Sequence, residues 1–458
     1  MEQRQLRVEG PIAGGTRNRP WVTAMTDPAS RGYVTEEYFF EGEAVRFEPT
    51  PGSELGDDGR WSLRVAGSAP FRSRLVVVRP SDPERFTGTV VVNWLNVSAG
   101  IELGSADGDE HLSGCAWVGV SAQKVGIDGF GGSSEYAAEA ERLPVGPLKR
   151  WEPERYGSLV HPGDEYSFDI FTQAVRVVSG RGGPVDGPDP LAGLQVERVL
   201  ATGASQSAIR LQSYLNGVQP LEGLVDGFLL TVPFGAGTTF EPSSPELPMG
   251  SVIPTRVRDD SQVPVMLLNS ETETTSIQPV RQHDTDRFVH WEVAGAPHAY
   301  MPGFPPAPVG EGRVPNTLSY APISEAALGH MLRWLRGGQA PPSQPRIEFA
   351  GQPAQIARDR FGNALGGIRL PEMAAPIAEY CGLGDGPGPF GWLFGWARLF
   401  SEEELASLYP SRQAYEDAYV RAVEECVAAG VVREQDGPSL KSQAAGVAAT
   451  LPLPEHAH

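Results

Sequence analysis

The stretch "ERVLATGASQSAIRLQSYLNG" (residues 197–217) decides the fold. A run of strand length ends at Gly203, and the residues from Gln206 onward have the apolar spacing of a helix, with Ile209 and Leu211 on its inner face. The sequence therefore predicts a β-strand that turns sharply into a helix, with Ser205 at the corner. Two chemistries use such a corner: a hydrolase places a nucleophilic serine there, and a dinucleotide-binding oxidoreductase places its phosphate loop there.

A dinucleotide loop fits this stretch poorly. Such a loop needs further glycines so that the backbone can approach the pyrophosphate, but Ser207, Ala208 and Ile209 stand where they would fall. The loop also lies about two hundred residues into the chain, and no tyrosine is followed by a lysine four positions later. The usual proton-relay pair of short-chain oxidoreductases is therefore missing.

A nucleophile elbow explains the same residues better. The strained turn around the serine requires small residues two positions before and after it, in the pattern G-x-S-x-G. Here Gly203 is present and Ser207 replaces the second glycine, which is a small but less specific substitute. The alternative is a simple packing contact of small residues between a strand and a helix.

The apolar runs around this elbow predict a doubly wound α/β sheet. Continuous apolar segments, rather than alternating ones, are typical of strands buried on both faces of a parallel sheet. Amphipathic helices are predicted over 164–179 and 323–338, between or after these strands. The predicted strands are 73–80, 88–96, 115–122, 196–203, 225–234, 263–270 and 288–295.

Two segments do not fit the sheet. Residues 124–160 have little periodicity and are expected to form an inserted cap or lid on a core of residues 1–338. Residues 339–458 are expected to form a C-terminal extension packed on that core, with a helical tail at about 402–430. Four aromatic residues in this extension are candidates for a pocket wall or for packing on the sheet: Phe390, Trp392, Phe394 and Trp396.

A serine nucleophile needs a base and a carboxylate that orients the base. In this architecture the acid follows the next-to-last strand and the histidine follows the last one. His298 directly follows the last predicted strand, whereas His283 and His290 lie before or inside it. Glu273 is favoured as the acid, and Glu271 remains the alternative because it lies closer to the strand end.

The oxyanion of such a site is expected to accept hydrogen bonds from two backbone N–H groups. One is the N–H of Gln206, which follows the nucleophile at the start of a helix. The other comes from the loop "NWLNVSAG" (93–100), where Asn96 and Val97 are the candidates and the Asn96 side chain could assist. The alternative for these two residues is an ordinary turn at the end of a strand.

Composition limits the partners. The 458-residue chain has a formal net charge of -20, which argues against nucleic acid and anionic membranes. It lacks a long apolar run and an N-terminal secretory pattern, so a cytoplasmic protein is expected. Three scattered cysteines form neither a disulfide scaffold nor a zinc site, and His161 with Asp164 makes a poor metal site. No cofactor or metal is expected, and homo-oligomerisation is left open.

With these residues identified, the chain resembles the α/β-hydrolases, and more narrowly a bacterial group of large α/β-hydrolase domain-containing esterases. The resemblance rests on "VVVNWLNVSAG", "ERYGSLVHPGDEYSFDIFTQA", "GASQSAIRLQSYLNGVQPL" and "FVHWEVAGAPHAY", and extends to residues 357–372 and 408–423. It implies that Ser205 and His298 are catalytic and that a carboxylic ester is hydrolysed without a cofactor.

The residues and the resemblance together favour a serine hydrolase that acts on a small-molecule ester through an acyl-enzyme. An acyltransferase would use the same Ser205, His298 and glutamate, and nothing in the sequence separates the two. A non-catalytic small-molecule binding protein on the same fold is the third reading.

Overall fold

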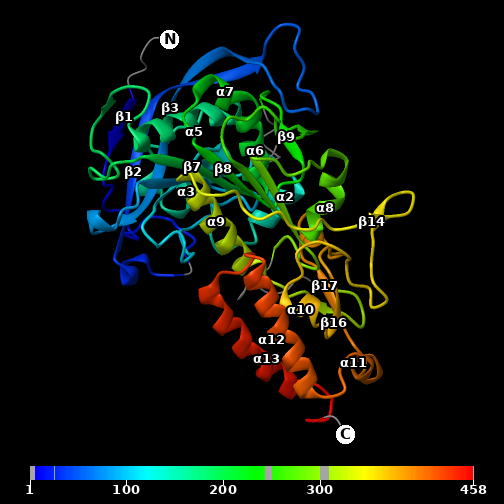
Figure 1. Ribbon diagram of the computed structural model, residues 1–458. Coiled ribbons are helices and arrows are strands. Elements are labelled where there is room, and N and C mark those ends of the chain that lie inside the picture. Colours follow the sequence, from blue (N-terminus) through cyan, green and yellow to red (C-terminus); the bar gives the residue numbers. More distant parts are fainter. Residues whose placement is uncertain (1–5, 25, 243–249, 300–308, 457–458) are drawn as a thin grey trace.

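The computed structural model describes residues 6–24, 26–242, 250–299 and 309–456, and it is built on a ten-stranded sheet (Figure 1). The strand order is β12-β11-β8-β7-β4-β5-β3-β2-β1-β6, and the strands from β12 to β5 all run parallel. The predicted doubly wound, mostly parallel sheet is therefore confirmed. The parallel strands are β4 (Thr89–Trp94), β5 (Ala116–Val120), β7 (Arg198–Ala204), β8 (Gly227–Thr231), β11 (Val265–Ser270) and β12 (Phe288–Val293).

An antiparallel edge extends the sheet beyond β5. Strands β2 (Tyr33–Pro49) and β3 (Leu63–Pro80) form a long hairpin, and only the second half of β3 was predicted as a strand. Many residues of this hairpin are charged or small, because one side of it is partly solvated, so no continuous apolar run marks it. The short strand β1 (Leu6–Glu9) pairs antiparallel with β2, and β6 (Val185–Asp186) pairs parallel with β1 at the end of the sheet.

Each face of the sheet has its own apolar core. On one face, Val90 and Val92 of β4 pack with helices α5 (Ser167–Ser179) and α6 (Gln206–Ser213). On the other face, Val91 of the same strand packs with α9 (Ala321–Leu335). This alternation along one strand is what burial on both faces requires.

The segment predicted as a cap contains four short helices. They begin directly after β5 and precede η3 (Asp164–Tyr166) and α5. Apolar side chains from this segment form a small separate core with Trp21 and Phe39. The four helices are α1 (Lys124–Asp128), α2 (Glu135–Ala140), α3 (Leu148–Trp151) and α4 (Pro153–Tyr156).

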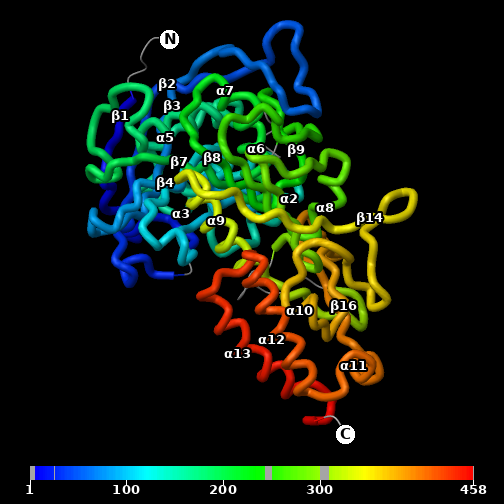
Figure 2. The backbone as a smooth tube through the Cα atoms, viewed as in Figure 1, coloured from blue at the N-terminus to red at the C-terminus, as the bar shows by residue number. Residues whose placement is uncertain are grey.

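The C-terminal extension packs on the α9 face of the sheet. Ile368 pairs with Val293 at the end of β12, and Ile347 and Met373 join the core on that face. Helices α12 (Arg412–Ala428) and α13 (Gly437–Thr450) lie side by side at the end of the molecule away from β1 and share a core of their own (Figure 2). The extension also contains α10 (Pro371–Ala374), β16 (Ala378–Cys381), β17 (Trp396–Leu399) and α11 (Glu402–Leu408).

The remaining short elements connect these parts. They are η1 (Pro28–Arg31), η2 (Pro83–Arg85), η4 (Tyr214–Val218), α7 (Gln219–Glu222), β9 (Ala236–Thr238), β10 (Val252–Pro254), α8 (Glu271–Ile277), η5 (Gln278–Val280), β13 (Val314–Pro315), β14 (Phe349–Ala350), β15 (Gln355–Ile356), η6 (Gly391–Leu393) and η7 (Glu434–Asp436).

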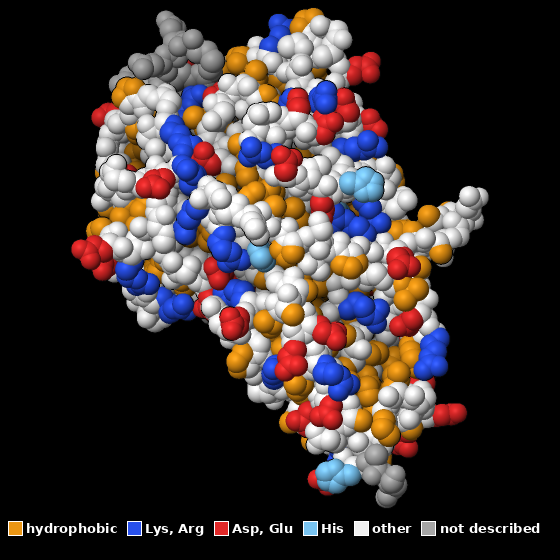
Figure 3. Space-filling view, viewed as in Figure 1, with side chains coloured by type: hydrophobic (Ala, Val, Ile, Leu, Met, Phe, Trp, Pro, Cys, Tyr) orange, Lys and Arg blue, Asp and Glu red, His pale blue; other side chains and the backbone are white. Residues whose placement is uncertain are grey.

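Acidic and basic side chains are interspersed over the face shown in Figure 3. The negative net charge therefore does not gather into one acidic region on this face. Within the described ranges, no helix is both long enough and apolar enough to cross a bilayer.

Candidate active site

Ser205 lies at the predicted corner between β7 and α6. Its backbone has φ 57° and ψ −123°, a conformation that costs a non-glycine residue about 1–3 kcal/mol. The turn is tight, because a Cβ on Gly203 would lie 2.9 Å from Leu211 Cδ1 and 3.0 Å from the Ser207 carbonyl carbon. Only glycine fits at that position, as the elbow pattern requires.

Ser207, which replaces the second glycine of the pattern, has a role beyond its small size. Its hydroxyl accepts a hydrogen bond from the Ala204 N–H at 3.0 Å and donates to the Ala204 carbonyl at 2.9 Å. The hydroxyl therefore ties the end of β7 to the first turn of α6, and this sets the angle at which Ser205 is presented.

The structure brings Ser205, His298 and Glu273 into one chain of hydrogen bonds. His298 Nε2 lies 2.9 Å from Ser205 Oγ, and His298 Nδ1 lies 2.6 Å from Glu273 Oε1. The imidazole is 6% exposed and the Glu273 carboxylate is fully buried. A buried carboxylate on Nδ1 favours the tautomer in which Nε2 is free to accept the serine proton.

The second oxygen of Glu273 is held by the start of its own helix. Ser270 caps α8, and Glu273 Oε2 accepts hydrogen bonds from the Ser270 N–H at 2.8 Å and the Ser270 hydroxyl at 2.9 Å. This arrangement is a capping box, in which the glutamate at the third helical position reaches back to the cap. Ser270 was not predicted as part of the site, although the spacing S-x-x-E in "SETE" (270–273) is the sequence signal of such a cap.

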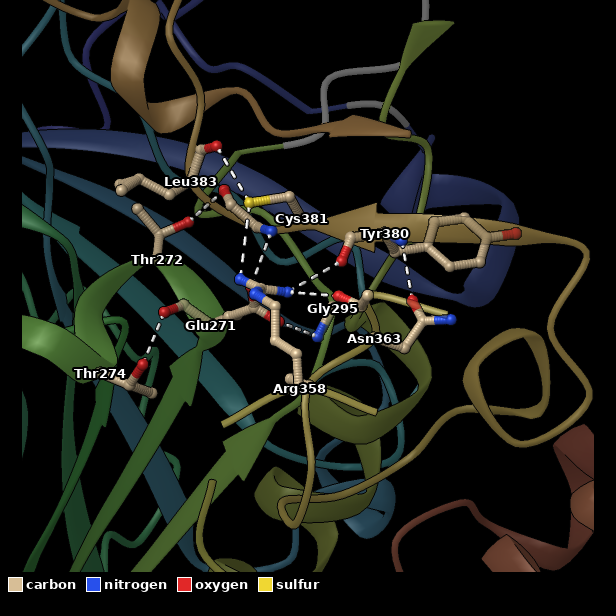
Figure 4. A network of polar contacts seen from close by, with 12 residues as sticks. Glu271, Thr272, Thr274, Gly295, Arg358, Asn363, Tyr380, Cys381 and Leu383 are labelled. Atoms are coloured by element: carbon tan, nitrogen blue, oxygen red, sulfur yellow. Dashed lines mark hydrogen bonds and ion pairs between the residues drawn. The ribbon is translucent and has the colours of Figure 1, made fainter. Parts of the chain in front are cut away.

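Glu271, the alternative acid, does not reach His298. Its Oε1 accepts from Arg358 Nη2 at 2.7 Å, and its Oε2 accepts from the Gly295 N–H at 2.7 Å. Figure 4 shows Glu271 and Arg358 facing each other, with Cys381 and Tyr380 of the extension around the guanidinium group. The structure thus separates the two glutamates, one toward the imidazole and one toward the extension.

Two aromatic side chains fix the histidine from other sides. The Phe234 ring stacks on the His298 ring with centroids 5.2 Å apart and 25° between the planes. The Tyr320 hydroxyl donates to the His298 carbonyl at 2.9 Å. Burial, and to a lesser extent the charge of Glu273, raises the pKa of Tyr320 above its ordinary value, so the hydroxyl remains a donor.

The loop after β4 lies against the elbow. The Asn96 side-chain amide donates to the Ala204 carbonyl at 2.9 Å, but the Asn96 backbone N–H is bonded to the Leu103 carbonyl at 2.9 Å. Among the described residues, no acceptor is found for the Val97 N–H. Of the two candidates in this loop, Val97 is therefore the one whose amide is not already engaged in the loop.

Gln206, the other expected donor, is the first residue of α6, and Gln123 holds its side chain. Its side-chain amide donates to Gln123 Oε1 at 2.8 Å, and the Trp94 indole N–H donates to the same oxygen at 3.0 Å. Gln123 in turn donates to Asp164 at 3.1 Å. This buried network joins β4, the start of the inserted segment and α6 beneath the serine.

The inserted segment and the aromatic part of the extension meet near the site. The rings of Tyr136 in α2 and Phe390 in the extension have centroids 5.4 Å apart. Trp392 lies 5.5 Å from Phe234 and 6.4 Å from His298 by ring centroids, and its side chain is 41% exposed. Of the four aromatic candidates, Trp392 therefore lies beside His298, and Phe390 contacts the inserted segment.

In the part of the chain that the structure describes, no group of three or more His, Cys, Asp or Glu residues is arranged to hold a metal ion. His161 and Asp164 have other partners: His161 Nε2 lies 2.8 Å from the Ala122 carbonyl, and Asp164 accepts from the Lys124 N–H at 2.8 Å. These contacts attach the inserted segment to the start of α5.

The chain belongs to the alpha/beta hydrolase domain family, whose sequence model matches residues 8–442. Membership of this family supports a hydrolase in general and does not specify the bond that is cleaved. No curated protein matches the chain.

Solved structures with a detectable likeness include several esterases, all at low identity. Est1E from Butyrivibrio proteoclasticus is 8% identical and is covered over 99% of its length, against 64% of this chain, with a TM-score of 0.30. A Rhizomucor miehei esterase is 11% identical and is covered over 83% of its length, against 60% of this chain, with a TM-score of 0.27. Esterase Est22 with p-nitrophenol is also 11% identical and is covered over 64% of its length, against 53% of this chain, with a TM-score of 0.26. Likenesses this distant say nothing about the substrate of this chain.

Proposed function

We propose that this protein is a serine hydrolase that cleaves a carboxylic ester through an acyl-enzyme, with Ser205, His298 and Glu273 as its triad. The observation that carries the proposal is the continuous chain of contacts from Ser205 Oγ to His298 Nε2 and from His298 Nδ1 to Glu273 Oε1. The strained backbone of Ser205 supports it as well, because nothing in packing alone requires a serine at that conformation.

In the first half of the proposed reaction, Ser205 Oγ attacks the ester carbonyl carbon while His298 Nε2 takes the hydroxyl proton. Negative charge then develops on the carbonyl oxygen, where the N–H groups of Gln206 and Val97 are the proposed donors. One such donor contributes about 3–4 kcal/mol to the barrier reduction. The carbon–oxygen bond to the alcohol breaks, and His298 gives its proton to the leaving oxygen.

In the second half, water attacks the acyl-serine carbonyl and His298 takes its proton. The bond from the acyl carbon to Ser205 Oγ breaks, the proton passes to Oγ, and the free acid leaves. The Glu273 carboxylate orients the imidazole through both halves and stabilises the imidazolium that forms in each. The capping box supports this role, because Ser270 holds the carboxylate in place while charge develops beside it.

The test is labelling with a fluorophosphonate probe and mapping of the modified residue by mass spectrometry. We expect one equivalent of label at Ser205 in the wild-type chain and none in Ser205→Ala or His298→Ala. A folded wild-type chain without label would contradict the proposal and favour a binding protein on the same fold. An acyltransferase differs only in the final acceptor, so product analysis with competing alcohols and amines separates it from a hydrolase.

A further inference from the structure

Three consecutive residues at the start of α8 hold the loop that carries His298. Glu273 contacts the imidazole itself. The Thr272 hydroxyl accepts a hydrogen bond from the His298 N–H at 2.8 Å. Glu271 binds the backbone just before the histidine, because its carboxylate accepts from the Gly295 N–H and its own N–H donates to the Ala296 carbonyl at 3.0 Å. The position of His298 therefore depends on all three.

The C-terminal extension completes two of these three contacts. Arg358 supplies the counter-charge of Glu271 at 2.7 Å, and the Gly382 N–H donates to the same carboxylate oxygen at 3.2 Å. The Gly382 carbonyl accepts from the Thr272 hydroxyl at 2.7 Å, which orients the hydroxyl oxygen toward the His298 N–H. Figure 4 labels Glu271, Thr272 and Arg358 of this network.

The extension backbone touches the histidine loop directly at Gly382. A Cβ at this position would lie 2.4 Å from the Ala296 carbonyl oxygen and 2.7 Å from Glu271 Cβ. No side chain fits between the two segments, so a displacement of the extension is passed directly to the backbone two residues before His298.

We propose that Arg358 and Glu271 are positioning residues for His298, and that the C-terminal extension is for this reason part of the catalytic apparatus. The inference rests on the proposed function. Its physical basis is that the Glu271 side chain is fully buried, whereas Arg358 is 30% exposed and arrives from a segment 87 residues away. A buried carboxylate that loses its cation is strongly destabilised, so we expect Glu271 to shift toward water and to weaken its contact with the Gly295 N–H.

The expected effect is on the chemical step rather than on substrate binding. A misplacement of about 1 Å in a reacting group costs on the order of 100-fold in rate. We therefore expect Arg358→Met in the full chain to lower kcat about 10- to 100-fold and to change KM less than about 2-fold. Arg358→Lys, which keeps the charge, should recover a large part of this loss.

A matched control is available in Arg433, another arginine of the extension that binds core carboxylates. It is 12% exposed and lies 3.1 Å from Glu110 and 3.0 Å from Glu325. Among the described residues, no hydrogen bond or ion pair joins it to residues 294–298. Arg433→Met should lower the unfolding temperature but leave kcat within about 2-fold of wild type, since it does not touch the histidine loop.

The experiment measures kcat and KM on p-nitrophenyl acetate, the rate of fluorophosphonate labelling at Ser205, and the unfolding temperature of each variant. A fall in kcat and labelling rate for Arg358→Met, but not for Arg433→Met, supports the inference. Equal activity in Arg358→Met and wild type, or equal losses in the two methionine variants, overturns it. If Arg358→Met does not fold, Glu271→Gln gives the same test, and an unchanged kcat overturns the inference.

Failure of the proposed function gives a different result. A wild-type chain that is neither labelled nor active on any ester overturns the proposed function, and the positioning role falls with it. An active wild type with an equally active Arg358→Met overturns the positioning role alone.

Discussion

Replacing Glu273 with glutamine is the change that best distinguishes the roles of the two glutamates of α8, Glu271 and Glu273. In the native site Glu273 Oε1 accepts from His298 and Oε2 accepts from Ser270. A glutamine can satisfy only one of these donors with its single oxygen. If the oxygen faces Ser270, the amide nitrogen donates to His298 Nδ1 and forces the proton onto Nε2. If the oxygen faces His298, the amide NH2 of the glutamine points at the Ser270 N–H, and both are hydrogen-bond donors.

The second arrangement is disfavoured because the amide NH2 then faces the Ser270 N–H, so the first should predominate and activity should fall strongly. With the proton on Nε2, the imidazole cannot accept the Ser205 proton, and the analogous change in serine proteases lowers kcat about 10⁴-fold. We expect a loss of about 10³- to 10⁴-fold here, which corresponds to about 4–5.5 kcal/mol of barrier. Glu271→Gln should cost at most about 100-fold, because it acts on the position of His298 and not on its tautomer.

The assay is kcat on p-nitrophenyl acetate for both variants, with circular dichroism and thermal unfolding to verify that each is folded. A Glu271→Gln loss larger than that of Glu273→Gln, in two equally folded proteins, would refute the assignment of the acid. Equal small losses in both would show that neither carboxylate orients the base.

Three further predictions concern the elbow, the site wall and the response to pH. Ser207→Ala removes the hydroxyl that ties Ala204 to α6, so the free energy of unfolding should fall by about 1–2 kcal/mol, measured by denaturant titration, and an unchanged value would contradict this bridging role. Trp392→Ala removes an exposed ring beside His298, so KM for esters with an aromatic acyl group should rise several-fold more than KM for acetate esters; parallel changes would rule out a contact with the substrate. Burial holds the pKa of His290 well below its ordinary value, so the unfolded chain binds a proton more tightly than the folded chain does. Stability should therefore be complete above about pH 6.5 and decline as pH falls below it, and His290→Gln should reduce this decline in pH-dependent thermal unfolding.

Much of the fold could be predicted from the sequence because the information is local. All seven predicted strands are present, since each is a continuous apolar run that only burial on both faces explains. The β2–β3 hairpin was largely missed because about half of its residues are exposed or only partly buried, so no continuous apolar run marks it. The extension contains α13 beyond the predicted helical tail, where alanine, glycine and serine predominate and give weak periodicity.

In the candidate site, too, some features depend on residues nearby in sequence and others depend on residues far away in sequence. By itself the sequence determined that Ser205 follows a strand at a tight corner, that His298 follows the last strand, and that two glutamates lie between them. These properties depend on residues that are close in sequence, so they can be predicted from the order of residues along the chain. Only the tertiary structure decided which glutamate faces the imidazole, because Glu271 and Glu273 lie on different sides of one helical turn and differ in what meets them. The partner that holds Glu271 away from His298 is Arg358, which is 87 positions distant and is brought there by the packing of the extension on the sheet.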